Sequence, residues 1–92
     1  MEKLTSNDHY QVVKVEFPAG KIMPRHVATS DAFLIVESGS ALLVYGNETY
    51  ELNKGDNISI PANEQHLLRP IEDFKGFIVL SGEGRIEYAQ EN

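Results

Sequence analysis

The sequence contains no cysteine and no tryptophan. Without cysteine, the protein has no disulfide, no thiolate nucleophile and no cysteine-ligated metal site. Imidazole is also scarce, because the chain has 3 histidines, namely His9, His26 and His66. A chemical site in this protein therefore depends on very few groups that titrate near neutral pH or bind transition metals.

Basic residues are few as well. The chain has 8 Lys and Arg residues against 14 Asp and Glu residues, which gives a net charge of −6. Nucleic acids and anionic lipid surfaces are bound by clusters of Lys and Arg. We therefore expect neither nucleic acid nor a membrane as a partner.

Long apolar runs are absent. The longest ones, residues 32–36 and 41–45, are far shorter than the roughly 20 residues of a membrane-spanning helix. The N-terminal residues lack the apolar stretch of a secretory signal, and we expect a cytoplasmic location. The 92 residues predict a single domain, residues 1–92, with core strands over about residues 10–80 and polar segments at both ends.

What the sequence does contain is a series of short runs rich in β-branched and aromatic residues. They predict strands at residues 10–17, 21–27, 32–37, 41–45, 48–52, 57–60, 65–69 and 74–80. Gly46 and Asn47 predict a tight hairpin turn, and Ile86 and Tyr88 mark one further short edge strand. No window carries the 3.6-residue period of an amphipathic helix. The fold class is therefore all-β, a sandwich or a barrel.

Residues 33–36 are apolar on both faces of their predicted strand. Because side chains alternate between the faces of a strand, one half of this run faces the interior and the other half faces outward. We expect the outward half to contact a second copy of the chain in a homodimer. The alternative is that loops cover it in part.

Glycine, histidine and proline recur at two characteristic spacings. The first set is Gly20, His26 and Gly39, and the second is Gly55, Pro61 and His66. In this order, joined by the hairpin, they resemble the two motifs of the cupin superfamily. The resemblance covers residues 20–70 and implies the cupin double-stranded β-helix, a jelly-roll barrel.

The departures from the motifs concern the metal site. In cupins that bind a metal, the ion is held at His, His, Glu and His positions, and only the first and last are kept here, as His26 and His66. The two positions between them are Ala28 and Ala32. The resemblance therefore implies an incomplete metal site, and we expect no cofactor. Asn63 replaces a glycine of the second motif and suits the same turn, because Asn tolerates positive φ better than most residues.

The preferred hypothesis is a small-molecule-binding or sensing domain with a metal-free pocket. In this hypothesis His26 and His66 face each other across a cavity that Ala28 and Ala32 enlarge. The apolar walls are Leu34, Val36 and Leu68. Two imidazoles could hold the polar end of a small ligand, a composition typical of ligand pockets.

Two alternatives remain. One is a metal-dependent cupin enzyme, an isomerase or dioxygenase, with iron, manganese, nickel or zinc at His26 and His66. Its carboxylate ligand would come from Asp31, Glu37 or Glu64, none of which occupies the family's ligand position. The other is a structural or partner-binding domain with a filled interior, where the two histidines satisfy each other or bind water.

No pattern places a hydroxyl beside a histidine and a carboxylate, so Ser30 and Ser59 predict no catalytic triad. We assign no catalytic residue from the sequence, and enzymatic activity stays open. His9 lies in a polar segment and is expected to be solvated.

Overall fold

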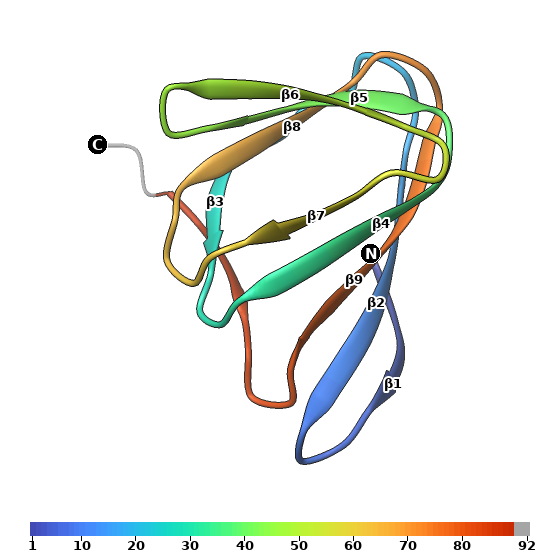
Figure 1. Ribbon diagram of the computed structural model, residues 1–92. Coiled ribbons are helices and arrows are strands. Elements are labelled where there is room, and N and C mark those ends of the chain that lie inside the picture. Colours follow the sequence, from blue (N-terminus) through green and yellow to red (C-terminus); the bar gives the residue numbers. More distant parts are fainter. Residues whose placement is uncertain (90–92) are drawn as a thin grey trace.

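Short strands connected by tight turns make up the described part of the protein, residues 1–89 of a computed structural model (Figure 1). The strands of this part are β1 (Glu2–Ser6), β2 (Tyr10–Phe17), β3 (Met23–Ala28), β4 (Ala32–Ser38), β5 (Ser40–Tyr45), β6 (Glu48–Asn53), β7 (Asn57–Ile60), β8 (His66–Pro70), β9 (Phe74–Ser81) and β10 (Ile86–Tyr88). The last three residues of the expected domain lie outside this description.

Helix is absent from residues 1–89, so none of these residues forms a helix able to cross a membrane. The all-β expectation is confirmed. The cytoplasmic location stays a prediction.

The strands form two antiparallel five-stranded sheets. The β9 sheet has the order β1-β2-β9-β4-β7, and the β8 sheet has the order β10-β3-β8-β5-β6. Most neighbours within a sheet are distant in sequence, and the chain passes back and forth between the sheets, as in a jelly roll (Figure 1). The apolar core lies between the two sheets.

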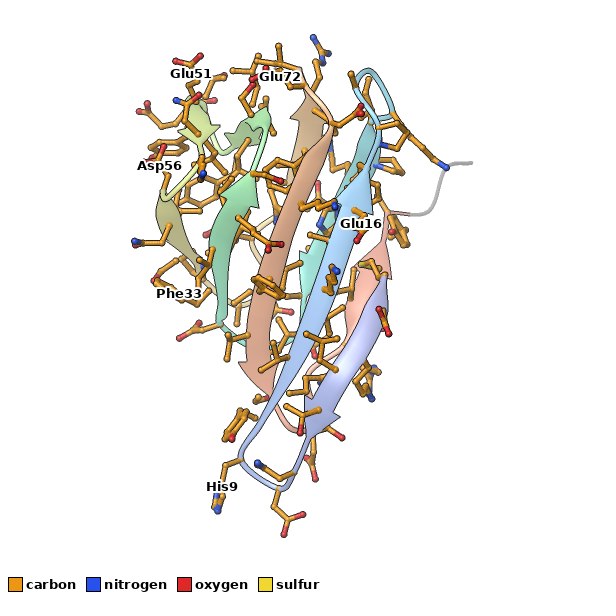
Figure 2. The ribbon with its side chains drawn as sticks, turned by 90° about the vertical axis from the view of Figure 1, so that its right-hand side faces the viewer. His9, Glu16, Phe33, Glu51, Asp56 and Glu72 are labelled. Carbon is orange, nitrogen blue, oxygen red and sulfur yellow. The ribbon has the colours of Figure 1, made fainter. Side chains whose placement is uncertain are left out.

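Alternation along β4 explains its two apolar faces. Ala32, Leu34 and Val36 are buried, whereas Phe33 and Ile35 are 37% and 38% exposed on the outer face of the β9 sheet. Figure 2 looks onto this outer face, where Phe33 is labelled. The predicted split into an inner and an outer half is confirmed.

Backbone angles confirm the predicted turn at Asn63 and explain the motif glycine Gly39. Asn63 has a φ of 66°, the left-handed conformation that its glycine-like position requires. Gly39 has a φ of 80°, and a Cβ added there would collide with the backbone carbonyl of Asp73. At position 39 both conformation and space therefore require glycine.

Strand β1 was not predicted, because Glu2–Ser6 is exposed along its length and its single apolar residue, Leu4, gives no apolar alternation. It is an edge strand held to β2 by backbone pairing. The strand predicted from residue 21 begins at Met23 instead, because Lys21 donates its backbone N–H to Pro18 in a turn. The short edge strand around Ile86 and Tyr88 is confirmed as β10.

Candidate functional site

Two buried histidines lie side by side in the middle of the β8 sheet. His26 on β3 is the direct cross-strand partner of His66 on β8, and the two side chains are 3% and 5% exposed. Their ring centroids are 4.1 Å apart and the ring planes meet at 64°. The expectation that they face each other across a cavity is wrong. As direct partners on adjacent antiparallel strands, they must point to the same side of the sheet.

Each ring is anchored to the backbone of its own strand region. His26 Nδ1 lies 2.6 Å from the carbonyl oxygen of Pro24, and His66 Nδ1 lies 2.9 Å from that of Glu64. A carbonyl oxygen only accepts, so both Nδ1 atoms donate. The idea that the two rings satisfy each other is therefore wrong, because each finds its partner two residues earlier in the chain.

The remaining ring nitrogens determine the polar chemistry of the site. With Nδ1 protonated, the Nε2 of a neutral imidazole is an acceptor with a free lone pair. Within residues 1–89, every fully buried side-chain N or O atom has a hydrogen-bond partner. The Nε2 atoms of His26 and His66, which have no protein donor among the described bonds, are therefore not completely buried.

Burial keeps both rings neutral at physiological pH. The pKa of His26 is lowered to about 4, mainly by removal of the ring from water. The hydrogen bond to Pro24 opposes this shift, and the neighbouring His66 contributes to it. Removal from water also lowers the pKa of His66, opposed by its bond to Glu64. The pair therefore carries no charge at pH 7.

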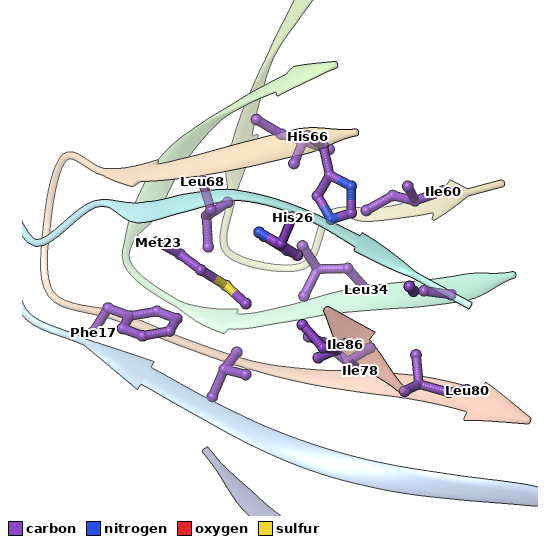
Figure 3. A pocket seen from close by; sticks show the side chains of 14 residues that line it. Phe17, Met23, His26, Leu34, Ile60, His66, Leu68, Ile78, Leu80 and Ile86 are labelled. Carbon is purple, nitrogen blue, oxygen red and sulfur yellow. The ribbon is translucent and has the colours of Figure 1, made fainter. Parts of the chain in front are cut away.

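The rings border a cavity between the two sheets with a volume of about 30 Å³ (Figure 3). Its wall is apolar except for the two imidazoles, and it contains no charged side chain. Of the predicted site residues, the ones that line it are His26, Ala28, Ala32, Leu34, His66 and Leu68. These six residues therefore lie around one cavity.

Val36 does not line this cavity, which corrects its predicted role as a wall. Its side chain is buried elsewhere in the core, and its backbone bonds the turn that contains Gly55 and Asp56. The lining residues that sequence reasoning missed are Val15, Phe17, Met23, Leu43, Ile60, Ile78, Leu80 and Ile86. They are apolar strand residues like many others, and only the packing of the two sheets distinguishes them.

A second hollow lies next to the cavity, with His26 in the wall of both. This rim groove has a volume of about 350 Å³, and its other lining residues are Val27, Gln65, Glu87, Tyr88 and Ala89. Tyr88 pairs with His26 across β10 and β3, and the two ring centroids are 5.6 Å apart. Tyr88 lies beside His26 because β10 pairs with β3 at the edge of the sheet, and the spacing of residues along the sequence did not reveal this pairing.

The donor set does not fit the metal that many cupins hold. Metal sites of this kind commonly use three or more protein ligands, including a carboxylate in many iron sites. Among residues 1–89, no group of three or more His, Asp or Glu side chains is arranged to hold an ion. Glu37 and Glu64 are exposed, and Asp31 accepts the backbone N–H of Ala62 at 2.9 Å. Two imidazoles alone are left.

The hydroxyl groups weighed from the sequence also lie apart from the histidines. Ser30 Oγ donates to the Asp31 carbonyl at 3.1 Å and accepts the backbone N–H of Ser81 at 3.1 Å. Ser59 is exposed on β7. His9 is exposed near the turn between β1 and β2, as expected (Figure 2).

Known proteins resemble this chain along most of its length. An uncharacterized protein of Methanocaldococcus jannaschii is 29% identical over 82 residues, which cover 87% of this chain and 71% of that protein. An RmlC-like cupin structure from the same organism superimposes with a TM-score of 0.80 at 26% identity, covering 88% of this chain and 77% of that one.

An enzyme has a similar fold. The DMSP lyase DddQ from Ruegeria pomeroyi superimposes with a TM-score of 0.80 at 21% identity, and the match covers 94% of this chain and 47% of the lyase. At this identity the likeness concerns the fold alone. The family model for the cupin domain matches residues 13–74, which is most of the barrel. Together with the two sheets and the two motif histidines inside them, this match establishes that the chain belongs to the cupin domain family.

Proposed function

We propose that this cupin domain binds a small molecule in its interior cavity and works as a binding or sensing module without a resident metal. One observation carries the proposal. Two neutral imidazoles, whose Nδ1 atoms are bound to the backbone and whose Nε2 atoms have no described protein partner, line a cavity that is otherwise apolar. An apolar wall with a few convergent polar groups is the usual composition of a ligand site.

The alanines at the former ligand positions contribute space. Ala28 and Ala32 are buried and line the cavity, where the family's metal-binding members would place a His and a Glu. Small side chains there leave room beside the imidazoles. Leu34 and Leu68 supply apolar contact area for the ligand.

The size of the cavity limits what can enter. One water-sized occupant needs roughly 10–15 Å³ of such volume, so about 30 Å³ holds a group of two or three heavy atoms. Pockets for drug-sized ligands are roughly ten times larger or more. We propose that the ligand places a small end in the cavity and extends past His26 into the rim groove.

A thermal-shift screen with small metabolites, followed by NMR mapping, tests this function. A ligand that binds the native state raises the apparent melting temperature, and its shift changes should centre on His26, His66 and Leu34. Ala28→Leu, which fills the cavity, should abolish binding, whereas Val36→Ala, a buried control away from the wall, should retain it. Binding that survives Ala28→Leu would contradict the proposal.

Metal analysis of the purified protein is the second test. Stoichiometric iron, manganese, nickel or zinc that survives dialysis would overturn the metal-free assignment. No observation favours the metal-dependent isomerase or dioxygenase considered from the sequence, because the described residues supply only two convergent ligands.

A partner-binding role is the second candidate, and a specific surface favours it. Phe33 and Ile35 on β4 pair with Val79 and Phe77 on β9 on the outer face of the β9 sheet, which makes a continuous apolar patch. Continuous exposed patches of this kind mark interaction sites. The proposed partner is a second copy of the chain, as the sequence led us to expect.

A further inference from the structure

We infer that the interior cavity selects neutral molecules that carry a hydroxyl group on a short apolar chain, and that it rejects carboxylates and molecules that lack a hydrogen-bond donor. The inference rests on the proposed function, since it names the ligand class of the same cavity. It follows from the hydrogen bond between each imidazole and the backbone, which uses Nδ1 and leaves Nε2 as the free nitrogen.

In both imidazoles of the cavity wall, the nitrogen that is not bound to the backbone is an acceptor. The bonds from His26 Nδ1 to Pro24 and from His66 Nδ1 to Glu64 leave the Nε2 lone pairs as the polar groups of the wall. A hydroxyl can donate to one of them. An ether, a carbonyl or a carboxylate can only bring a further acceptor, and its entry would leave buried acceptors without partners.

The rings cannot readily exchange these roles. In the other neutral tautomer, the lone pair of His26 Nδ1 would face the Pro24 carbonyl oxygen at 2.6 Å, a repulsive contact between two acceptors. The same holds for His66 and Glu64 at 2.9 Å. A ring flip would give up the backbone bond inside a buried site. Two independent anchors of the same kind therefore hold both rings as acceptors.

Charge around the site also disfavours anions. No cationic side chain lines the cavity or the rim groove. The one ionisable carboxylate in the groove wall is Glu87, whose Oε2 lies 3.8 Å from Arg85 Nη2. A carboxylate ligand would lose its hydration without gaining a donor or a positive charge. An ammonium ligand would also enter a cavity whose walls hold no carboxylate to pair with it.

The volume of the cavity restricts the length of the ligand's apolar part. The cavity of about 30 Å³ accepts the hydroxyl and one or two carbons, and His26 borders both the cavity and the groove. We place the short alkyl chain of the ligand past this ring and in the rim groove, whose wall includes Tyr88 and Val27.

Four probes of similar size separate these features. 1-Butanol and diethyl ether are isomers that differ in the donor, while butyrate and butylammonium add a negative and a positive charge. Each is titrated into the protein at pH 7, and dissociation constants are measured from backbone amide shifts. The tautomer of each histidine is read from ¹⁵N shifts of the rings. We expect 1-butanol to bind about tenfold more tightly than each of the others, because only it donates without charge.

The expected ring signals are Nδ1–H for both His26 and His66, with the Nε2 signal of at least one ring moving as 1-butanol binds. An Nε2–H tautomer at either ring overturns the inference even in the absence of ligand. Equal or tighter binding of diethyl ether, butyrate or butylammonium at the cavity also overturns it, and leaves the proposed function standing. If none of the four probes binds, the inference fails, and the metabolite screen with Ala28→Leu decides the proposed function separately.

A variant pair tests the acceptor directly. His66→Gln places an amide N–H₂ donor in the wall, and the preference for 1-butanol over butyrate should fall about tenfold toward equality. His9→Gln is the matched control, because His9 is exposed at the β1–β2 turn, and it should leave the preference unchanged. An unchanged preference in His66→Gln contradicts the inference. If that variant does not fold, the four-probe comparison and the ring tautomers of the unaltered protein still decide it.

Discussion

At the scale of single residues, the two interior histidines combine burial with an incomplete set of hydrogen bonds. His26 and His66 each satisfy Nδ1 through a backbone carbonyl, and Nε2 of each ring has no described protein partner. A core histidine with no further role is usually satisfied at both nitrogens. The open acceptor is the feature on which the proposed ligand site rests.

The lowered histidine pKa values predict acid sensitivity. His26 has a pKa of about 4 in the fold and 6.5 when unperturbed, so the unfolded chain binds more protons between these pH values. Stability is complete above pH 6.5 and is lost as the pH falls toward 4. We expect protonation of His26 to lower the unfolding free energy by about 2 kcal/mol over this window, less than the full shift would give, since the ring is not completely buried.

Urea unfolding at pH 7 and pH 4.5 measures this loss. The double variant His26→Gln with His66→Gln should lose less stability on acidification than the unaltered protein. His9→Gln should behave like the unaltered protein, because that ring is exposed. Equal losses of stability in the double variant and the parent would show that the fold does not lower the pKa values of the two histidines.

Two glycines form a matched test of steric space. Gly39 and Gly20 have similar φ values of 80° and 83°, but an added Cβ meets the Asp73 backbone only at Gly39. Gly20→Ala should cost about 1 kcal/mol for the left-handed backbone. Gly39→Ala should cost about 3 kcal/mol or more, because the collision adds to it. Denaturant midpoints measure both, and equal costs would contradict the role of the close approach.

At the scale of elements, strand alternation decides which side chains reach the cavity. His26 and Ala28 are two residues apart on β3 and both point inward, and Ala32 begins β4 on the same interior. Side chains two residues apart share a face of a strand. The cavity wall therefore follows from the register of β3, β4 and β8.

This register predicts that a metal site can be restored. Ala28→His with Ala32→Glu adds an imidazole and a carboxylate to the two existing imidazoles, which gives the four ligands of the family motif. We expect the double variant to bind zinc or manganese at least about 100-fold more tightly than the parent, at a stability cost of about 1–3 kcal/mol from overpacking. Calorimetric titration with each metal measures the affinity.

The control for this design is the triple variant that also carries His66→Gln, which should lose most of the gained affinity. A folded double variant with no gain in metal affinity would show that positions 28 and 32 do not present their side chains to His26 and His66.

At the scale of the whole molecule, the two faces of the β9 sheet have different surroundings. Its inner face packs on the core, while its outer face presents Phe33 (Figure 2), and Ile35, Phe77 and Val79 share that face by their register. A chain of 92 residues buries a smaller fraction of its surface than a larger domain does. Association is one way to cover such a patch.

We predict that a homodimer forms through this outer face. Ile35→Glu should shift the protein to monomer, because an ionised carboxylate at the centre of an apolar interface is strongly unfavourable. Ile71→Glu is the control, since Ile71 is 49% exposed in a turn away from this patch. Light scattering after size exclusion measures the mass of each. A monomeric parent, or an Ile35→Glu variant that stays dimeric, contradicts the prediction.

Several local features could be predicted because they depend on few neighbouring residues. Alternation identified most strands, and the φ preference of Asn identified the turn at Asn63. The polar edge strand β1 gave no such signal, since backbone pairing with β2 holds it. Val36 was misplaced as a cavity wall because alternation tells which residues point inward but not how deep along the barrel each one lies.

The sequence by itself determined the all-β fold, the family motifs, the two interior histidines and the alanines that stand at the family's other ligand positions. Only the tertiary structure decided that His26 and His66 are cross-strand neighbours with both Nδ1 atoms bound to backbone, and that Tyr88 lies beside them. The reason is physical. Turn and strand preferences act over a few residues, whereas these contacts join segments that are far apart in the chain and meet only when the barrel closes.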